Sequence, residues 1–235
     1  MIIGILQCDD VADTLRPKHG NYPQMFTQLF EALGEDIQCN VYRVIEGQYP
    51  STLDECDAYI TTGSRFGVND VQDWIETLEH FVIELYRANK KLIGICFGHQ
   101  LMAKALGGVV EKSSKGWGVG VNTTQVQRQQ RWMGQGQDEI SLVVSHQDQV
   151  VQLPADSQIL ASSEFCPFYM IQINEHFLGI QGHPEFSKDY SYDLMLARRA
   201  RIPGRCIAAG IDSLALQTDD KLVTRWLINF LRQGG

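Results

Sequence analysis

Residues 91–108, KLIGICFGHQLMAKALGG, decide the fold of this chain. Residues 92–95 form an apolar run typical of a buried strand, and residues 100–106 have helical spacing that ends at two glycines. Between them, Gly94-Ile95-Cys96-Phe97-Gly98 predicts a tight strand-to-helix turn that presents the Cys96 side chain at the end of a sheet. Side chains at the two flanking positions would collide across such a turn, which explains the glycines.

On the amino-terminal side of this stretch, short apolar strands alternate with helices. Strands are expected at residues 2–8, 41–44 and 58–62, and helices at residues 22–33 and 74–85. Alternation of this kind implies an α/β fold with an open, mostly parallel, twisted sheet covered by helices on both faces. Ligands bind such sheets at the carboxyl ends of the strands, where Cys96 falls.

The second half of the chain changes character. Short strands are expected at residues 109–111, 118–126, 140–145, 159–162, 169–173 and 178–181, which adds a small antiparallel portion. Helices are expected at residues 189–200, 205–209 and 219–231, and the Gln-rich segment 125–137 is expected to be an exposed loop or hairpin tip. Without a repeat or a Pro- or Ser-rich linker, residues 1–235 are expected to form a single domain, with residues 193–235 as a helical carboxyl-terminal extension.

The composition argues against several kinds of partner. Of the 235 residues, 44% are hydrophobic and 20% charged, and the formal net charge is −8. This charge disfavours nucleic acid and anionic membrane surfaces as partners, and no apolar run is long enough to span a bilayer. The compact basic cluster consists of Arg198, Arg199, Arg201 and Arg205. Because short charge runs are usually solvated, we interpret it as an exposed helix face in preference to a binding patch.

The cysteines and the amino terminus indicate the compartment. The six cysteines are scattered without a CxxC pair, and the first ten residues, MIIGILQCDD, resemble a strand more than a signal peptide. Reduced thiols in the cytoplasm are therefore expected. Five cysteines are expected in or near the core. Cys96 differs, because a thiol at a helix N-terminus is favoured as the reactive thiolate.

A second motif, Gly182-His183-Pro184-Glu185-Phe186, supplies the groups that a thiol nucleophile needs. A nucleophile needs a base, and the base needs an orienting partner. His183 suits the first role and Glu185, two residues on, suits the second. Alone, a His-x-Glu after a strand is more often structural, and a lone Gly-x-Cys-x-Gly is compatible with a buried structural cysteine. Their occurrence together favours a catalytic triad.

Three segments together resemble the class I glutamine amidotransferases. Residues 94–108, GICFGHQLMAKALGG, are similar to the nucleophile segment of that family. Residues 144–150, VSHQDQV, resemble its Ser-His-x-Asp-x-Val segment, and residues 181–186, QGHPEF, resemble its His-Pro-Glu segment. The order and spacing are those of the family, and the resemblance covers about residues 1–190. It implies the family's flavodoxin-like fold.

The resemblance implies a role for each member of the site. Cys96 would be the nucleophile, His183 the base and Glu185 the group that orients the base. The oxyanion of the tetrahedral intermediate would be stabilised by backbone N–H groups, here those of Phe97, Gly63 and Ser64.

The same resemblance indicates how the substrate would be held. Gln100 matches the position whose side chain helps to hold the glutamyl group, and Ser145 and His146 match the segment whose backbone binds its α-amino and α-carboxylate groups. A second catalytic base at His146 is disfavoured, because the triad is already complete. For His99 and Asp148, the sequence supports a structural role in shaping the pocket at least as well as a direct role in binding or catalysis.

The sequence departs from the family's commonest Gly-Gly-Pro pattern at Gly63-Ser64-Arg65. Because backbone N–H groups form the oxyanion site, the change is compatible with function, but it leaves the loop shape and the role of Arg65 open. Thr62-Gly63-Ser64 is more similar to the stand-alone branch of the family, which includes γ-glutamyl peptidases.

The leading hypothesis is a stand-alone hydrolase of γ-glutamyl amides or peptides that forms a Cys96 thioester. The alternative is a glutaminase subunit that supplies ammonia to a separate synthetase chain, as in GMP synthase, and a remote third is an inactive binding or regulatory module. The first is favoured because the sequence lacks a GxxxxGK[ST] nucleotide-binding loop and the segment after the motifs is too short for a synthetase domain. This chemistry requires no metal or organic cofactor, and the expected partner is a small γ-glutamyl substrate.

Overall fold

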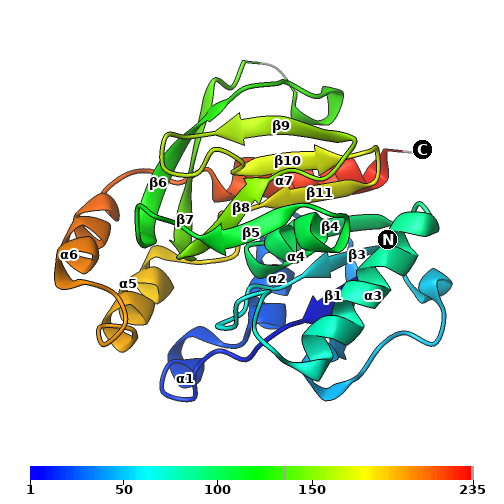
Figure 1. Cartoon of the computed structure of the whole chain (residues 1–235), viewed down its shortest axis with the longest axis horizontal. Helices are drawn as coiled ribbons and strands as arrows, with labels where there is room; N and C mark the ends of the chain where they lie inside the picture. Colours follow the sequence, from blue (N-terminus) through cyan, green and yellow to red (C-terminus); the bar gives the residue numbers. More distant parts are fainter. Residues whose placement is uncertain (135, 234–235) are drawn as a thin grey trace.

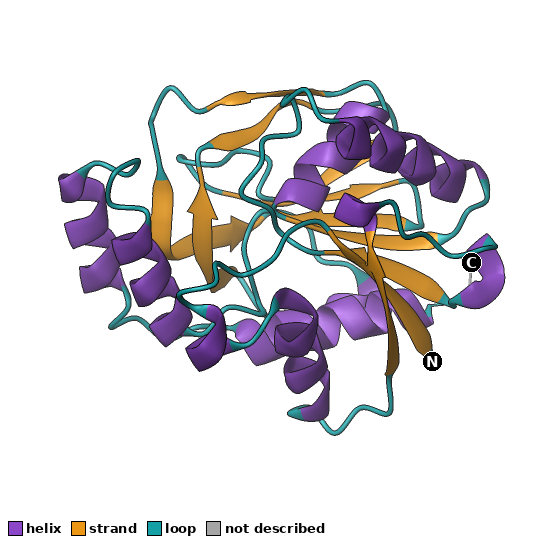
Figure 2. Ribbon diagram, turned by 90° about the horizontal axis from the view of Figure 1, so that it is seen from below, coloured by secondary structure: helices purple, strands orange, loops and turns teal. Residues whose placement is uncertain are grey.

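The computed structural model describes residues 1–134 and 136–233. Within these residues the strands form a nine-stranded mixed sheet and a separate two-stranded sheet, and helices cover both faces of the large sheet (Figures 1 and 2). The order of the large sheet is β2-β1-β3-β4-β11-β10-β9-β6-β7. The predicted α/β fold class is therefore confirmed.

One half of the large sheet is parallel. Its five adjacent strands are β2 (Gln38–Arg43), β1 (Ile2–Gln7), β3 (Ala58–Thr61), β4 (Lys91–Ile95) and β11 (Phe177–Ile180). Strand β2 begins and ends earlier than the predicted residues 41–44. The other strands of this half lie where the apolar runs indicated.

The antiparallel portion is more extensive than the sequence indicated. It continues the large sheet through β10 (Met170–Ile173), β9 (Ser157–Ser162), β6 (Gly118–Val126) and β7 (Glu139–His146). The two-stranded sheet pairs β5 (Val109–Lys112) with β8 (Asp148–Gln152), a strand that was not predicted.

Helices cover the large sheet because its strands are apolar on both faces. On one face, Ile3 and Ile5 of β1 form a core with α2 (Tyr22–Glu31) and α7 (Asp220–Arg232). On the other face, Leu6 and Leu92 belong to a core with α3 (Asp73–Arg87) and α4 (Phe97–Ala105). Alternate residues of a strand point to opposite faces, so one apolar run serves both cores.

The remaining helices lie beside the antiparallel half and in the connections. They are α1 (Arg16–His19), α5 (Lys188–Ala197), α6 (Gly204–Ser213) and the short 3-10 helices Val44–Glu46, Leu53–Glu55 and Arg131–Met133.

The last of these 3-10 helices changes the interpretation of the Gln-rich segment. Trp132 and Met133 are buried, and the Trp132 ring packs edge-on against Phe230 of α7 at 5.6 Å between ring centroids. The expectation of a wholly exposed loop at residues 125–137 is therefore wrong for these two side chains. Gln135 of that segment lies outside the described residues.

The parallel register places three loops next to one another at the carboxyl edge of the sheet. Strands β3, β4 and β11 are adjacent, and the loops that follow them begin at Thr62, Cys96 and Gln181. Segments far apart in the sequence thus meet at this edge.

Candidate active site

Cys96 occupies a strained turn between β4 and α4. Its backbone has φ +49° and ψ −95°, a conformation that residues with side chains rarely adopt, and its N–H donates to the Ile180 carbonyl at 2.8 Å. A Cβ at Gly98 would lie 1.6 Å from Thr61 Oγ1, and one at Gly94 would lie 2.7 Å from the Gly98 backbone. The two glycines are thus required, because a side chain at either position would clash with the atoms on the other side of the turn or with Thr61.

The Cys96 thiol is held by a chain of side-chain amides. Gln181 Nε2 donates to Cys96 Sγ at 3.3 Å, and Gln181 Oε1 accepts from Gln100 Nε2 at 3.0 Å. Gln100 Nε2 also donates to the Asp148 carbonyl at 2.7 Å. The predicted residue Gln100 therefore adjoins the thiol through Gln181, a buried residue to which the sequence assigned no role. Its place at the end of β11, beside β4, is the feature that indicates it.

His183 is fixed on two sides. Its Nδ1 donates to Glu185 Oε1 at 2.7 Å, and its ring stacks on Phe186 with centroids 3.8 Å apart and an interplanar angle of 6°. The His183 backbone N–H donates to the Val143 carbonyl at 2.8 Å. With Nδ1 and one ring face occupied, Nε2 is the ring nitrogen left for chemistry, as the triad hypothesis requires.

The charges around His183 favour its protonated form. Burial lowers the pKa of the imidazole, but the Glu185 carboxylate and the Cys96 sulfur outweigh burial and raise this pKa to about 10. The second carboxylate oxygen of Glu185, Oε2, is buried and has no hydrogen-bond partner among the described residues. A buried carboxylate satisfied chiefly by one imidazole stabilises the imidazolium strongly.

A small hollow joins Cys96 to His183. Gly63 and Ser64 line it, and a Cβ at Gly63 would lie 2.8 Å from His183 Cε1. Ser64 Oγ donates to the Cys8 carbonyl at 3.0 Å and accepts from the Phe66 N–H at 3.2 Å, which fixes the loop that follows β3. Phe97, the first residue of α4, lines the adjoining cavity. The structure thus brings all three predicted oxyanion residues to the thiol.

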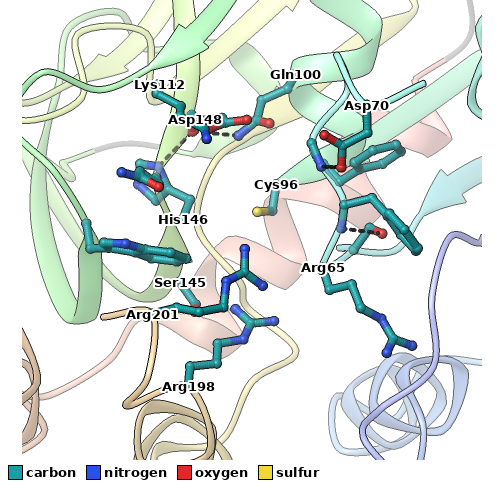
Figure 3. Close-up of a pocket in the computed structure, with 16 residues that line it drawn as sticks. Arg65, Asp70, Cys96, Gln100, Lys112, Ser145, His146, Asp148, Arg198 and Arg201 are labelled. Atoms are coloured by element: carbon teal, nitrogen blue, oxygen red, sulfur yellow. Dashed lines mark hydrogen bonds between the residues drawn. The ribbon is translucent and has the colours of Figure 1, made fainter. Parts of the chain in front are cut away.

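A larger cavity of about 130 Å³ opens in front of Cys96, and Gln100, Ser145, His146 and Asp148 line it (Figure 3). His146 Nδ1 donates to the Asp148 carbonyl at 3.0 Å, and burial lowers the pKa of His146 to about 4, so that this ring is neutral near pH 7. Burial also raises the pKa of the Asp148 carboxyl.

His99 lies away from this cavity. It is wholly buried, and a Cβ at Gly179 of β11 would lie 2.5 Å from its Nδ1. Burial lowers the pKa of His99 to about 3, so that the ring packs under the sheet as a neutral group. Of the two roles weighed for this residue, the geometry supports the structural one.

The interpretation of the basic cluster as a solvated helix face is wrong for Arg198, which is half-buried. Arg198, at the carboxyl end of α5, lines both the cavity and the hollow, and its Nη1 donates to Ser145 Oγ at 2.9 Å. Arg201 also lines the cavity, with its guanidinium 5.8 Å from the Trp117 ring centroid. Arg199, Arg201 and Arg205 are exposed, as predicted.

Arg65 is committed to the buried carboxylate of Asp9. Its Nη2 donates to Asp9 Oδ1 at 2.6 Å, its Nε donates to the same carboxylate, and its backbone N–H donates to Asp9 Oδ2 at 2.8 Å. Arg65 of the Gly63-Ser64-Arg65 variant therefore has a structural role, because it anchors the loop after β3 to the residues after β1.

Metal-binding clusters and membrane-spanning helices are both absent from the part of the chain that the structure describes. No group of three or more His, Cys, Asp or Glu side chains in these residues is arranged to hold a metal ion. In the same residues, no helix has the length and apolar character to cross a membrane.

An α/β sheet that carries a cysteine at a strained elbow, beside a His–Glu pair in the loop after the neighbouring parallel strand, has the architecture of the nucleophile-elbow enzymes. The family description "Glutamine amidotransferase class-I" matches residues 22–200. The chain belongs to this family, as the three sequence motifs indicated.

Individual relatives agree with the family. Gamma-glutamyl peptidase 3 of Arabidopsis thaliana is 33% identical over 196 residues, which cover 80% of this chain and 77% of that protein. A glutamine-hydrolysing GMP synthase subunit of Sulfolobus acidocaldarius is 34% identical over 134 residues, 57% of this chain and 69% of that one. A solved glutamine amidotransferase from Thermotoga maritima matches with a TM-score of 0.75 over 99% of this chain and 98% of its own, at 16% identity, which supports the fold.

Proposed function

We propose that the chain is a stand-alone γ-glutamyl hydrolase that cleaves γ-glutamyl amide bonds through a thioester on Cys96. The observation that carries the proposal is the hollow shared by Cys96 and His183, with Glu185 Oε1 2.7 Å from His183 Nδ1. A thiol, a base and an oriented carboxylate in this order are the parts of a cysteine triad.

The first half of the reaction would acylate Cys96. The thiolate attacks the γ-carbonyl carbon, an S–C bond forms, and the carbonyl electron pair moves to oxygen. Backbone N–H groups of Phe97 and of the Gly63–Ser64 segment donate to that oxyanion. When the carbonyl re-forms, the C–N bond breaks, and His183 Nε2 gives its proton to the departing amine. A pKa of about 10 keeps that proton on His183 at neutral pH.

The second half would release glutamate. In the thioester the sulfur carries no charge, so one of the two groups that raise the His183 pKa is lost and the imidazole gives up its proton more readily. The neutral imidazole then deprotonates a water molecule, whose oxygen attacks the thioester carbonyl. The S–C bond breaks, and glutamate and the Cys96 thiolate leave the tetrahedral intermediate. The cycle consumes one water and needs no cofactor.

Similarity to γ-glutamyl peptidases over 80% of the chain favours a γ-glutamyl peptide as substrate. The similarity to a GMP synthase subunit over 57% of the chain favours the second candidate, a glutaminase that passes ammonia to a synthetase partner. All six cysteines are free, which supports a reducing compartment such as the cytoplasm.

The two candidates differ in what the isolated chain does. The purified protein should hydrolyse at least one γ-glutamyl peptide with a kcat/KM clearly above that for glutamine, measured as glutamate released. The same measurement is repeated after adding cell extract and ATP. A preference for glutamine that appears only with the extract would establish the ammonia-donor function instead.

A further inference from the structure

The structure provides a space on the side of Cys96 from which the amine departs. The amine must leave next to His183, and the hollow that contains both Cys96 and His183 is also lined by Tyr22 and Arg198. Tyr22 and Arg198 line a second cavity of about 260 Å³, twice the volume of the cavity in front of Cys96. The second cavity therefore adjoins the hollow at Tyr22 and Arg198, and its volume suits a leaving group larger than ammonia.

The charges in this second space are unbalanced. Asp9 and Asp10 line it, but Asp9 is paired with Arg65, and Asp10 Oδ2 accepts from Arg43 at 2.9 Å. Arg198 and Arg201 line the same space, and neither takes part in any ion pair among residues 1–134 and 136–233. The acids are thus neutralised by other groups, while two guanidinium charges remain available to a ligand.

Both arginines also line the cavity in front of Cys96, on the opposite side of Cys96 from Gln100 (Figure 3). Figure 3 shows Gln100, Lys112 and Asp148 on one side of Cys96, and Arg198 and Arg201 on the other. The first group lines the cavity in front of Cys96 but is not among the residues that line the hollow beside His183. A substrate whose glutamyl end lies against Gln100 would therefore direct its other end toward the arginines.

We propose that Arg198, assisted by Arg201, binds a carboxylate on the leaving group, so that the preferred substrates are γ-glutamyl amino acids or peptides with a free carboxyl terminus. The inference rests on the proposed γ-glutamyl hydrolase activity. Guanidinium groups bind carboxylates through paired N–H donors, and their charge persists across the working pH range. The hydrogen bond from Arg198 Nη1 to Ser145 Oγ holds the side chain over the site before a ligand arrives.

The test compares two substrates that differ only at that carboxylate, γ-glutamyl-alanine and γ-glutamyl-alaninamide. The wild-type kcat/KM should be roughly ten- to a hundredfold higher for the free acid, the range that a charged hydrogen bond contributes. In Arg198→Gln the ratio of the two kcat/KM values should fall toward one, chiefly because KM for the free acid rises. Arg199→Gln is the matched control: this exposed neighbour is not among the residues lining either cavity, and its substitution should preserve the ratio.

The outcomes separate the inference from the proposed function. Equal turnover of the two substrates by the wild-type protein, or an equal loss for both in Arg198→Gln, would overturn the carboxylate subsite while leaving the γ-glutamyl hydrolase intact. Absence of turnover of either substrate, with glutamine hydrolysed in the presence of extract, would overturn the proposed function and the inference with it.

Discussion

Replacing Glu185 by Gln tests the electrostatic coupling at the centre of the site. Gln preserves the size of the side chain and an oxygen that accepts from His183 Nδ1, but it removes the charge. Glu185 is the first of the charges that raise the His183 pKa from 6.5 to about 10, and burial opposes them. Without Glu185 this pKa should fall well below 10.

The consequence for activity follows from the direction of this shift. Acylation needs protonated His183, so the wild-type rate should persist through neutral pH and fall as the pH rises through about 10. In Glu185→Gln the fall should begin at lower pH, and kcat should drop by roughly a hundred- to ten-thousandfold with a smaller change in KM.

The assay is a pH–rate profile of glutamate release, with folding checked by thermal unfolding. Asp193→Asn is a matched control, because Asp193 Oδ2 lies 2.7 Å from His19 Nε2, the same separation in a His–carboxylate pair outside the cavity of Cys96. The control should retain the wild-type profile. A Glu185→Gln enzyme with near-normal kcat and an unshifted alkaline limb would refute the assignment, and another acid would then orient His183.

Two further predictions concern the elbow. Cys96→Ser should be nearly inactive in glutamate release, because a hydroxyl is far less ionised than a thiol. Alkylation that abolishes activity should label Cys96 before Cys166, because burial raises the pKa of the Cys166 thiol to about 12. Labelling of Cys166 first, with activity retained, would contradict this assignment. Gly98→Ala should unfold or inactivate the protein, because its Cβ would lie 1.6 Å from Thr61 Oγ1. The control Gly204→Ala should keep both Tm and activity, because the new Cβ would meet no other side chain or loop within 4 Å. A fully active, stable Gly98→Ala protein would show that the turn is not as tight as described.

The sequence predicted the parallel half of the fold because its determinants are local. The apolar runs around Ile5, Ile60 and Ile93 are flanked by turns and helices, and a parallel sheet with both faces buried needs such continuous runs. The antiparallel half was underestimated because the pairing of β6 with β7 and β9 depends on contacts between distant segments. Strand β8 was missed since Gln149 and Gln152 interrupt its apolar pattern.

The functional site, like the fold, was predicted from the sequence only in part. The proximity of Cys96 and His183 was predictable, because each follows a strand of the same sheet. Arg198 was not predicted, since the basic cluster was interpreted from charge alone. The pattern of buried residues along α5 could have identified Arg198. Tyr190 and Leu194 are buried four residues apart, and Arg198 is the next position on the same helix face. An arginine in register with a buried stripe faces the protein, whereas the exposed Arg199 does not.

The position of Arg198 also bears on the choice between the two functions. Arg198 lines the hollow that contains Cys96 and His183, and it also lines the second cavity, which is partly open and lies between α5 and the segment after β1 that contains Asp9 and Asp10. Helix α5 is fixed against the sheet, because Leu194 packs in one core with Val143 of β7. The uncompensated positive charge of Arg198 and Arg201 favours a leaving group that carries its own negative charge, and ammonia has none. The geometry of α5 therefore favours a hydrolase that recognises its whole substrate.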